Sequence, residues 1–298
     1  MQAYLGEFSA LLVAFFWTVT ALAFERASLR IGSLSLNVIR LIMGFVFLTL
    51  FIWIKRGMPF PSDATGYNWL WLSISGLIGF VFGDLFLFKA YAMIGSRFSM
   101  LIMTMAPPIA ALTGWFALGE KLMPLHLLGM FLTLLGISMA IFVRKAGKKG
   151  ISMKLSLKGS LFAFLGAAGQ GVGLVLSKVG MQEYDPFAAT QIRLIAAIAG
   201  FAILTTWLGR WKQVIVATGN KQGMSSAALG SFFGPFLGVS FSLLAIKYTQ
   251  TGIAATIMAI VPILIIPPVV ILYKEKVKVL EIIGSVISIT GVSLLFII

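Results

Sequence analysis

The chain repeats itself once, and the two copies are separated by one fixed offset. A proline, a glutamate and two glycines of the first half recur in the second half: Pro107, Glu120, Gly129 and Gly136 match Pro262, Glu275, Gly284 and Gly291. The differences 262 − 107, 275 − 120, 284 − 129 and 291 − 136 all equal 155. A single offset that superposes four residues of three types indicates an internal duplication, so the fold must be built from two related halves.

The composition is that of a membrane protein. Of 298 residues, 59% are hydrophobic and 11% are charged, and the mean hydropathy is +1.02. Soluble domains are about 45–50% apolar and about 25% charged. With no cysteine and one histidine, His126, the usual thiolate and zinc sites are not available, so we expect no cofactor and no metal. The formal charge of +14 comes from residues between apolar stretches, which fits an anionic lipid surface and not nucleic acid.

Ten stretches reach the roughly 20 apolar residues that a membrane-spanning helix needs. They are 5–24, 34–54, 69–94, 98–118, 124–143, 160–179, 187–208, 227–246, 253–273 and 279–298. The longer connections are 55–68, 144–159 and 209–226. We therefore predict an all-α integral membrane fold of ten helices, with one five-helix repeat at 1–143, a basic linker at 144–159 and a second five-helix repeat at 160–298.

The first stretch could be a secretory signal, because Ala21-Leu22-Ala23 has the small-x-small form. No lysine or arginine precedes it, however, and it has a partner in the sixth stretch, so we interpret it as a membrane helix. An odd number of spans in each half inverts the second half relative to the first. Inverted repeats are typical of transporters, whose site lies between the repeats near the middle of the membrane.

Five short stretches carry a family resemblance: Phe16-Trp17, Arg40-Leu41, Gly83-Asp84, Lys89-Ala90 and the run Ala-Ile-Lys-Tyr-Thr at 245–249. With the ten predicted spans, they resemble the drug/metabolite transporter superfamily, and within it the EamA type. The resemblance covers essentially the whole chain. It implies export or exchange of metabolites, amino acids or sugar phosphates, with both termini in the cytoplasm. The positive-inside rule favours both termini outside the cell, because most loop lysines and arginines would then face the cytoplasm. Both orientations therefore stay open.

Arg40 and Arg193 each lie about two turns inside an apolar stretch, at matching positions of the two halves. An intramembrane arginine normally faces protein or water and has a partner. With Asn37 and Gln191 beside them, the two arginines could bind a carboxylate or phosphate. Alternatively, each could be structural and reach towards the membrane surface.

Asp84 is the carboxylate that lies deepest within a predicted span. It could bind substrate or protons, or it could form a fixed ion pair with Arg40 or Lys89. Lys89 follows five residues later and so does not share its helical face, which favours a partner on another helix. Glu120 and Glu275 lie at helix ends beside Lys121 and Lys276, which favours a structural role.

A cavity is predicted where Trp17 and Thr20 of the first stretch face Gln170 of the sixth. Methionines of the fourth stretch could add an adaptable wall: Met100, Met103 and Met105. Small-x-x-x-small spacings predict close helix packing at Gly79 and Gly83, at Gly169 and Gly173, and at Gly230, Gly234 and Gly238.

Prolines within the fourth and ninth stretches, Pro107 with Pro108, Pro262, and Pro267 with Pro268, would remove hydrogen bonds inside a helix. We interpret Pro107 and Pro262 as gating positions, with plain kinked packing as the alternative.

The sequence shows no metalloprotease, hydrolase or nucleotide-binding motif, so we expect no enzyme and no ATP-driven pump. It predicts a secondary transporter of the cytoplasmic (inner) membrane that exports a small polar metabolite such as an amino acid, by alternating access. The alternatives are an exchanger of anionic solutes, a channel and a membrane-embedded lipid enzyme. The expected partners are a small-molecule substrate, the lipid bilayer and protons as a candidate coupling ion, in a monomer or homodimer.

Overall fold

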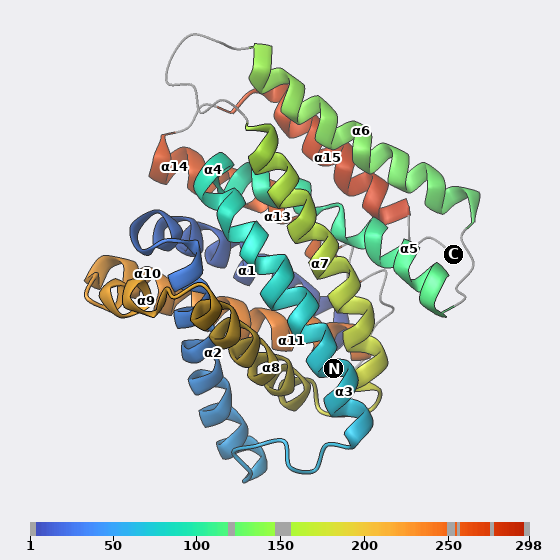
Figure 1. The fold of residues 1–298 in the computed structure, drawn as a ribbon. Helices are drawn as coiled ribbons and strands as arrows, with labels where there is room; N and C mark the ends of the chain where they lie inside the picture. The colour runs from blue at the N-terminus through green and yellow to red at the C-terminus, as the bar shows by residue number, and fades with distance from the viewer. Residues whose placement is uncertain are drawn as a thin grey trace.

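The structure, a computed structural model, describes residues 4–118, 123–146, 156–248, 254, 257–274 and 277–294. Within these residues the chain is helical and contains no β-strand (Figure 1). In a bilayer, helices satisfy every backbone N–H and C=O group within the chain itself. The all-helical fold predicted from composition is therefore confirmed for the part of the chain that is described.

Six described segments are long and apolar enough to cross a membrane. They are α1 (Leu5–Ile31), α2 (Ser33–Arg56), Gly66–Met103, α7 (Leu157–Met181), α8 (Pro186–Trp207) and Lys221–Tyr248. Shorter apolar helices occupy Pro124–Met139, Val261–Tyr273 and Val279–Leu294. The chain is thus a multi-pass membrane protein, with six segments of membrane-spanning length among the residues that the structure describes.

Two of the long segments contain a π-helical stretch in the middle. In the first, α3 (Gly66–Gly76) runs through η2 (Leu77–Gly83) into α4 (Asp84–Met103). In the second, α10 (Lys221–Ser231) runs through η3 (Phe232–Gly238) into α11 (Val239–Tyr248). The differences 232 − 77 and 238 − 83 both equal 155, so this rare geometry follows the sequence repeat. Such wide turns are frequent at functional sites.

The predicted fourth and ninth spans are not continuous helices. The fourth span is divided at Thr104 and Met105, between the end of α4 at Met103 and the start of α5 (Ala106–Leu118). The non-helical residue within α4, Gly95 (φ 80°, ψ 161°), lies where the sequence predicts the connection between the third and fourth spans. The ninth span is divided at Ile265 into α13 (Val261–Leu264) and α14 (Ile266–Tyr273).

The prolines of these spans stand at helix starts. Pro107 is the second residue of α5, Pro262 of α13 and Pro267 of α14. In the first turn of a helix the N–H group has no intrahelical partner, so proline removes no hydrogen bond there. The prediction that these prolines interrupt helix interiors is therefore wrong.

The predicted loop 209–226 also contains helix. α9 (Trp211–Thr218) lies within it, and α10 begins at Lys221. The side chain of Asn220 accepts a hydrogen bond of 2.9 Å from the N–H of Gly223, which caps the first turn of α10. This cap by a polar residue, which hydropathy does not register, explains why α10 begins before the predicted eighth span.

The fifth helices of the two halves, α6 (Pro124–Ala146) and α15 (Val279–Leu294), lie side by side (Figure 1). A Cβ built on Gly291 would lie 2.6 Å from the carbonyl oxygen of Gly129, and one built on Gly136 would overlap the carbonyl oxygen of Gly284. As the residue number increases along α6, the number of the facing residue on α15 decreases, so the two helices are antiparallel. The four glycines that defined the repeat form the contact between its copies.

Candidate functional site

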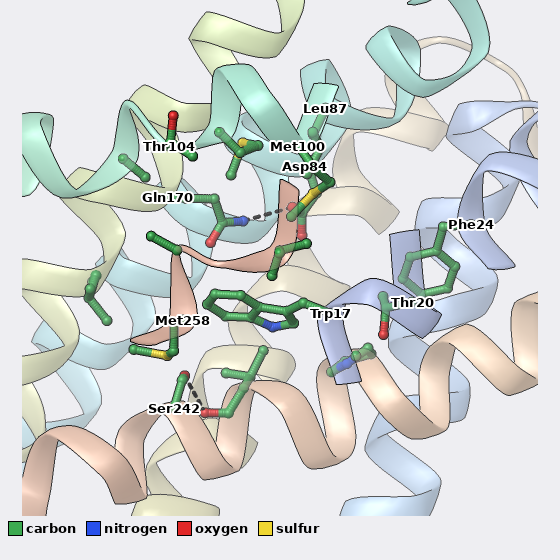
Figure 2. Close-up of a pocket in the computed structure, with 18 of the residues that line it drawn as sticks. Trp17, Thr20, Phe24, Asp84, Leu87, Met100, Thr104, Gln170, Ser242 and Met258 are labelled. Carbon is green, nitrogen blue, oxygen red and sulfur yellow. Dashed lines mark hydrogen bonds between the residues drawn. The ribbon is translucent and has the colours of Figure 1, made fainter. Parts of the chain in front are cut away.

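A cavity of about 170 Å³ lies between the two halves of the chain. A buried water needs about 10–15 Å³ of such space, so the cavity has room for a small metabolite. Figure 2 shows Trp17 within it, with Asp84 and Gln170 on one side of the indole ring and Ser242 and Met258 on the other. The wall takes residues from both repeats.

One face of α1 supplies three of the lining side chains. Trp17, Thr20 and Phe24 are spaced three and four residues apart, which places them on the same side of a helix. Each packs against a glycine of the second half: Gly238, Gly234 and Gly230, respectively. A Cβ on Gly238 would lie 2.9 Å from the indole Nε1 of Trp17. The predicted glycine stripe therefore makes room for the aromatic wall.

Arg40 and Asp84 form a buried ion pair at the cavity wall. Nη2 of Arg40 lies 2.6 Å from Oδ2 of Asp84, and both residues are buried. Gln170 Nε2 donates a hydrogen bond of 2.7 Å to the other carboxylate oxygen, Oδ1. Arg40 Nε also donates to Oδ1 of Asn37 at 3.2 Å. Of the two candidate partners of Asp84, Arg40 is the one that forms the ion pair. Lys89 instead lies over the rings of Phe86 and Phe162.

Close packing of glycines brings this network together. A Cβ built on Gly169 of α7 would lie 2.6 Å from the Cα of Gly83, so the backbones of α7 and η2 are in contact. Asp84 follows Gly83 and Gln170 follows Gly169, which explains why their side chains meet. The predicted close approach at Gly83 and Gly169 is confirmed, and its consequence is a polar network inside the membrane.

Arg193 lines the same cavity from α8 and is 4% exposed. Its guanidinium carbon lies 4.7 Å from the centre of the Phe80 ring, and that of Arg40 lies 5.6 Å from the same ring. Arg193 Nε is buried without a hydrogen-bond partner. The two related arginines therefore meet at Phe80, but within the described ranges only Arg40 has a carboxylate partner.

The remaining predicted site residues occupy different places. Pro107 and Pro262 line the cavity at the starts of α5 and α13. Asn37 lies behind Arg40 and does not reach the wall. Gln191 lies away from the cavity, and its Nε2 donates hydrogen bonds to Thr49 Oγ1 and to the carbonyl oxygen of Pro59. Gln191 thus joins α8 to α2 and to the loop after it.

Sequence reasoning did not identify Tyr91 or Phe88, although a signal was present. Asp84, Leu87, Phe88 and Tyr91 recur with helical spacing and all line the cavity. Ser242 and Met258 were also missed, and nothing in their sequence context marks them. Of the three predicted methionines, Met100 and Met103 line the cavity, and Met105 does not.

Glu120 and Glu275 lie outside the described residues. Among the residues that are described, no three His, Cys, Asp or Glu side chains come together as a metal ion would require.

A helical membrane protein with a cavity between two related halves, lined by apolar side chains and a few buried charged groups, belongs structurally with membrane transporters. The model of the EamA-like transporter family matches residues 4–142 and, a second time, residues 157–297. The chain therefore belongs to the EamA-like transporter family, part of the drug/metabolite transporter superfamily that the sequence resembles.

The fold is also similar to that of a solved protein. A crystal structure titled only "Crystal structure of protein" superposes with a TM-score of 0.63 at 20% sequence identity, over 98% of this chain and 95% of the other. At that identity the likeness concerns the fold alone. No curated protein matches the chain.

Proposed function

We propose that the protein is a secondary active transporter that exports a small polar metabolite, an amino acid or a similar compound, across the cytoplasmic membrane. The observation that carries the proposal is the cavity itself. Both repeats line it: Trp17, Arg40 and Asp84 come from the first repeat, and Gln170 and Arg193 come from the second. A site between inverted repeats is where alternating access requires the substrate to bind.

The proposed architecture is ten spans in two inverted five-helix repeats. Three observations support it: the double match of the family model, the antiparallel contact of α6 with α15, and the recurrence of the π-helical stretch after 155 residues. The rocking of one repeat against the other would open the cavity to each side in turn. Protons are the candidate coupling ion, with Asp84 as the group that would bind them, and the protein acts as a monomer or homodimer.

Pro107 and Pro262 support a gating role for the broken fourth and ninth spans. Each stands in the first turn of a helix that starts beside the cavity. A short helix joined to the rest of its span by a single turn, as at Thr104 and Ile265, can tilt while the hydrogen bonds in its interior stay intact. We propose that these helices move when the cavity opens.

Reconstituted vesicles test the transport function. Purified protein is placed in proteoliposomes that are loaded with labelled amino acids, and efflux is measured against the internal concentration, with protein-free liposomes loaded in the same way as the control. The proposal expects saturable flux that Trp17→Ala weakens. A constant ionic conductance, or chemical turnover of lipid without any solute flux, would identify a channel or an enzyme instead.

The second candidate function is exchange of anionic solutes. The guanidinium of Arg193, which faces the cavity without a carboxylate partner among the described residues, favours it. In the same vesicles an exchanger would show flux only when an organic anion is present on both sides of the membrane.

A further inference from the structure

We propose that Arg193 is the anion subsite of the central cavity and that it binds a single carboxylate group of the transported molecule. This inference rests on the proposed transport function and specifies which charged group the substrate carries.

The first argument is that no described carboxylate forms an ion pair with Arg193, although the charge of Asp84 acts on it at longer range. The side chain of Arg193 is buried and lines the cavity, and its Nε has no hydrogen-bond partner. Its neighbours are the ring of Phe80 and Gly79, where a Cβ would lie 3.2 Å from Arg193 Nη2. A buried charge without a partner is costly, so a bound anion that pairs with it is strongly favoured.

The second argument is that Arg40 is already neutralised. Asp84 holds it at 2.6 Å, and the second oxygen of that carboxylate accepts from Gln170. The three charged groups of the wall, Arg40, Asp84 and Arg193, therefore sum to one positive charge. One carboxylate group on the ligand pairs with Arg193, whereas a second carboxylate finds no further unpaired cationic group on the described wall and a purely cationic ligand adds to its positive charge.

The third argument concerns the rest of the wall, which would meet the body of the ligand. It is formed largely by rings and thioethers, including Trp17, Phe24, Phe88, Met100 and Met258. Such a surface accepts an apolar body, while a guanidinium fork matches the two oxygens of a carboxylate. The geometry thus selects a compact molecule with one carboxylate at one end.

Four probes that share the same branched apolar body test the proposal. They are 4-methylpentanoate (one carboxylate), leucine (carboxylate and ammonium), isobutylmalonate (two carboxylates) and 4-methylpentanamide (neutral). Binding of each at millimolar concentration is measured by titration calorimetry and thermal shift on the purified full chain. Arg193→Gln removes the charge, Arg193→Lys keeps it, and Arg210→Gln removes one exposed positive charge far from the cavity wall.

The wild type should bind 4-methylpentanoate or leucine about tenfold or more tightly than the amide and the dianion. Which of the two binds better distinguishes a plain carboxylate substrate from an amino acid. Arg193→Gln should weaken the preferred probe by about 10- to 100-fold, as expected for the loss of charge-assisted hydrogen bonds. Arg193→Lys should restore part of that affinity, and Arg210→Gln should leave it unchanged.

Equal binding of the amide, retention of the carboxylate preference in Arg193→Gln, or no binding of either monocarboxylate to the wild type would each overturn the subsite. Vesicle flux separates this result from the transport function. Saturable flux of a neutral solute that Arg193→Gln does not alter would support the transport function and contradict the Arg193 subsite. Carboxylate binding that depends on Arg193, without any flux, would support the subsite and contradict the transport function.

Discussion

Gly136 of α6 lies against Gly284 of α15, so closely that a Cβ on the first would overlap the carbonyl oxygen of the second. Gly284 is the repeat counterpart of Gly129, not of Gly136, and Gly129 in turn lies against Gly291. This crossed relation is what a two-fold axis between inverted copies produces. The glycines that reveal the duplication in the sequence therefore also form the contact between the two repeats.

Substitution of Gly136 should destabilise the protein through that contact. Gly136→Leu would force backbone atoms of α6 and α15 apart, and we expect a loss of about 1–3 kcal/mol or more of unfolding free energy. Thermal unfolding in detergent measures it. Leu134→Met, on the exposed face of the same helix, is the control and should change little. An unchanged melting temperature in Gly136→Leu would show that the two helices are not in contact.

The Arg40 and Asp84 pair should behave as a coupled unit. Either Arg40→Gln or Asp84→Asn alone leaves one buried charge without its partner, and each should cost about 3–5 kcal/mol of unfolding free energy. The double variant should cost less than the sum of the two, with an interaction energy of about 0.5–3 kcal/mol. A double-mutant cycle by detergent or denaturant titration checks this. Additive losses would mean that the two side chains act separately.

Trp17 should govern the apparent affinity for substrate. Trp17→Ala removes the central ring of the cavity wall, and we expect KM in vesicle efflux to rise about tenfold. Trp17→Phe keeps an aromatic face and should retain most of the affinity. Trp207, which is 82% exposed, provides the control, since Trp207→Ala leaves the cavity intact. A KM that is equally altered in both alanine variants would contradict a specific role of Trp17.

Gly95 should resist any side chain. Its φ of 80° with ψ of 161° is a conformation that only glycine adopts readily, and a Cβ there would lie 3.3 Å from Oε1 of Glu25. We expect Gly95→Ala to cost about 1–3 kcal/mol of unfolding free energy. Gly66→Ala is the matched control, because a Cβ at Gly66 meets no atom within 4 Å. If both variants melt alike, the break in α4 at Gly95 is not required.

Acid should weaken the loop that joins α2 to α3. Partial burial raises the pKa of the Asp63 carboxyl, but hydrogen bonds from Tyr184 and Arg56 lower it by more, so this pKa lies below the ordinary 3.8. A lowered pKa in the folded state gives stability that is complete above about pH 5 and is lost as the pH falls through the folded-state pKa. The melting temperature of the wild type should therefore drop more steeply below pH 4 than that of Asp63→Asn. Parallel curves would show that Asp63 does not contribute.

The sequence by itself determined the repeat, the membrane class and much of the cavity. Hydropathy, residue spacing and the repeat were enough to place Trp17, Thr20 and Gln170 at one cavity. The same local information assigned the prolines to helix interiors, because it cannot show where a helix is broken. It also missed α9 and the start of α10, where the side chain of Asn220 caps the helix ahead of the predicted span.

Only the tertiary structure decided how the charges are used. Arg40 and Arg193 have equivalent sequence positions, but the contact of η2 with α7 aims Asp84 at Arg40 and leaves Arg193 without a carboxylate within the described residues. Gln191, two residues before Arg193, faces the opposite way and joins α2. The partner of a buried charge depends on how distant helices are rotated and packed against each other. The residue pattern of a single helix does not contain that information.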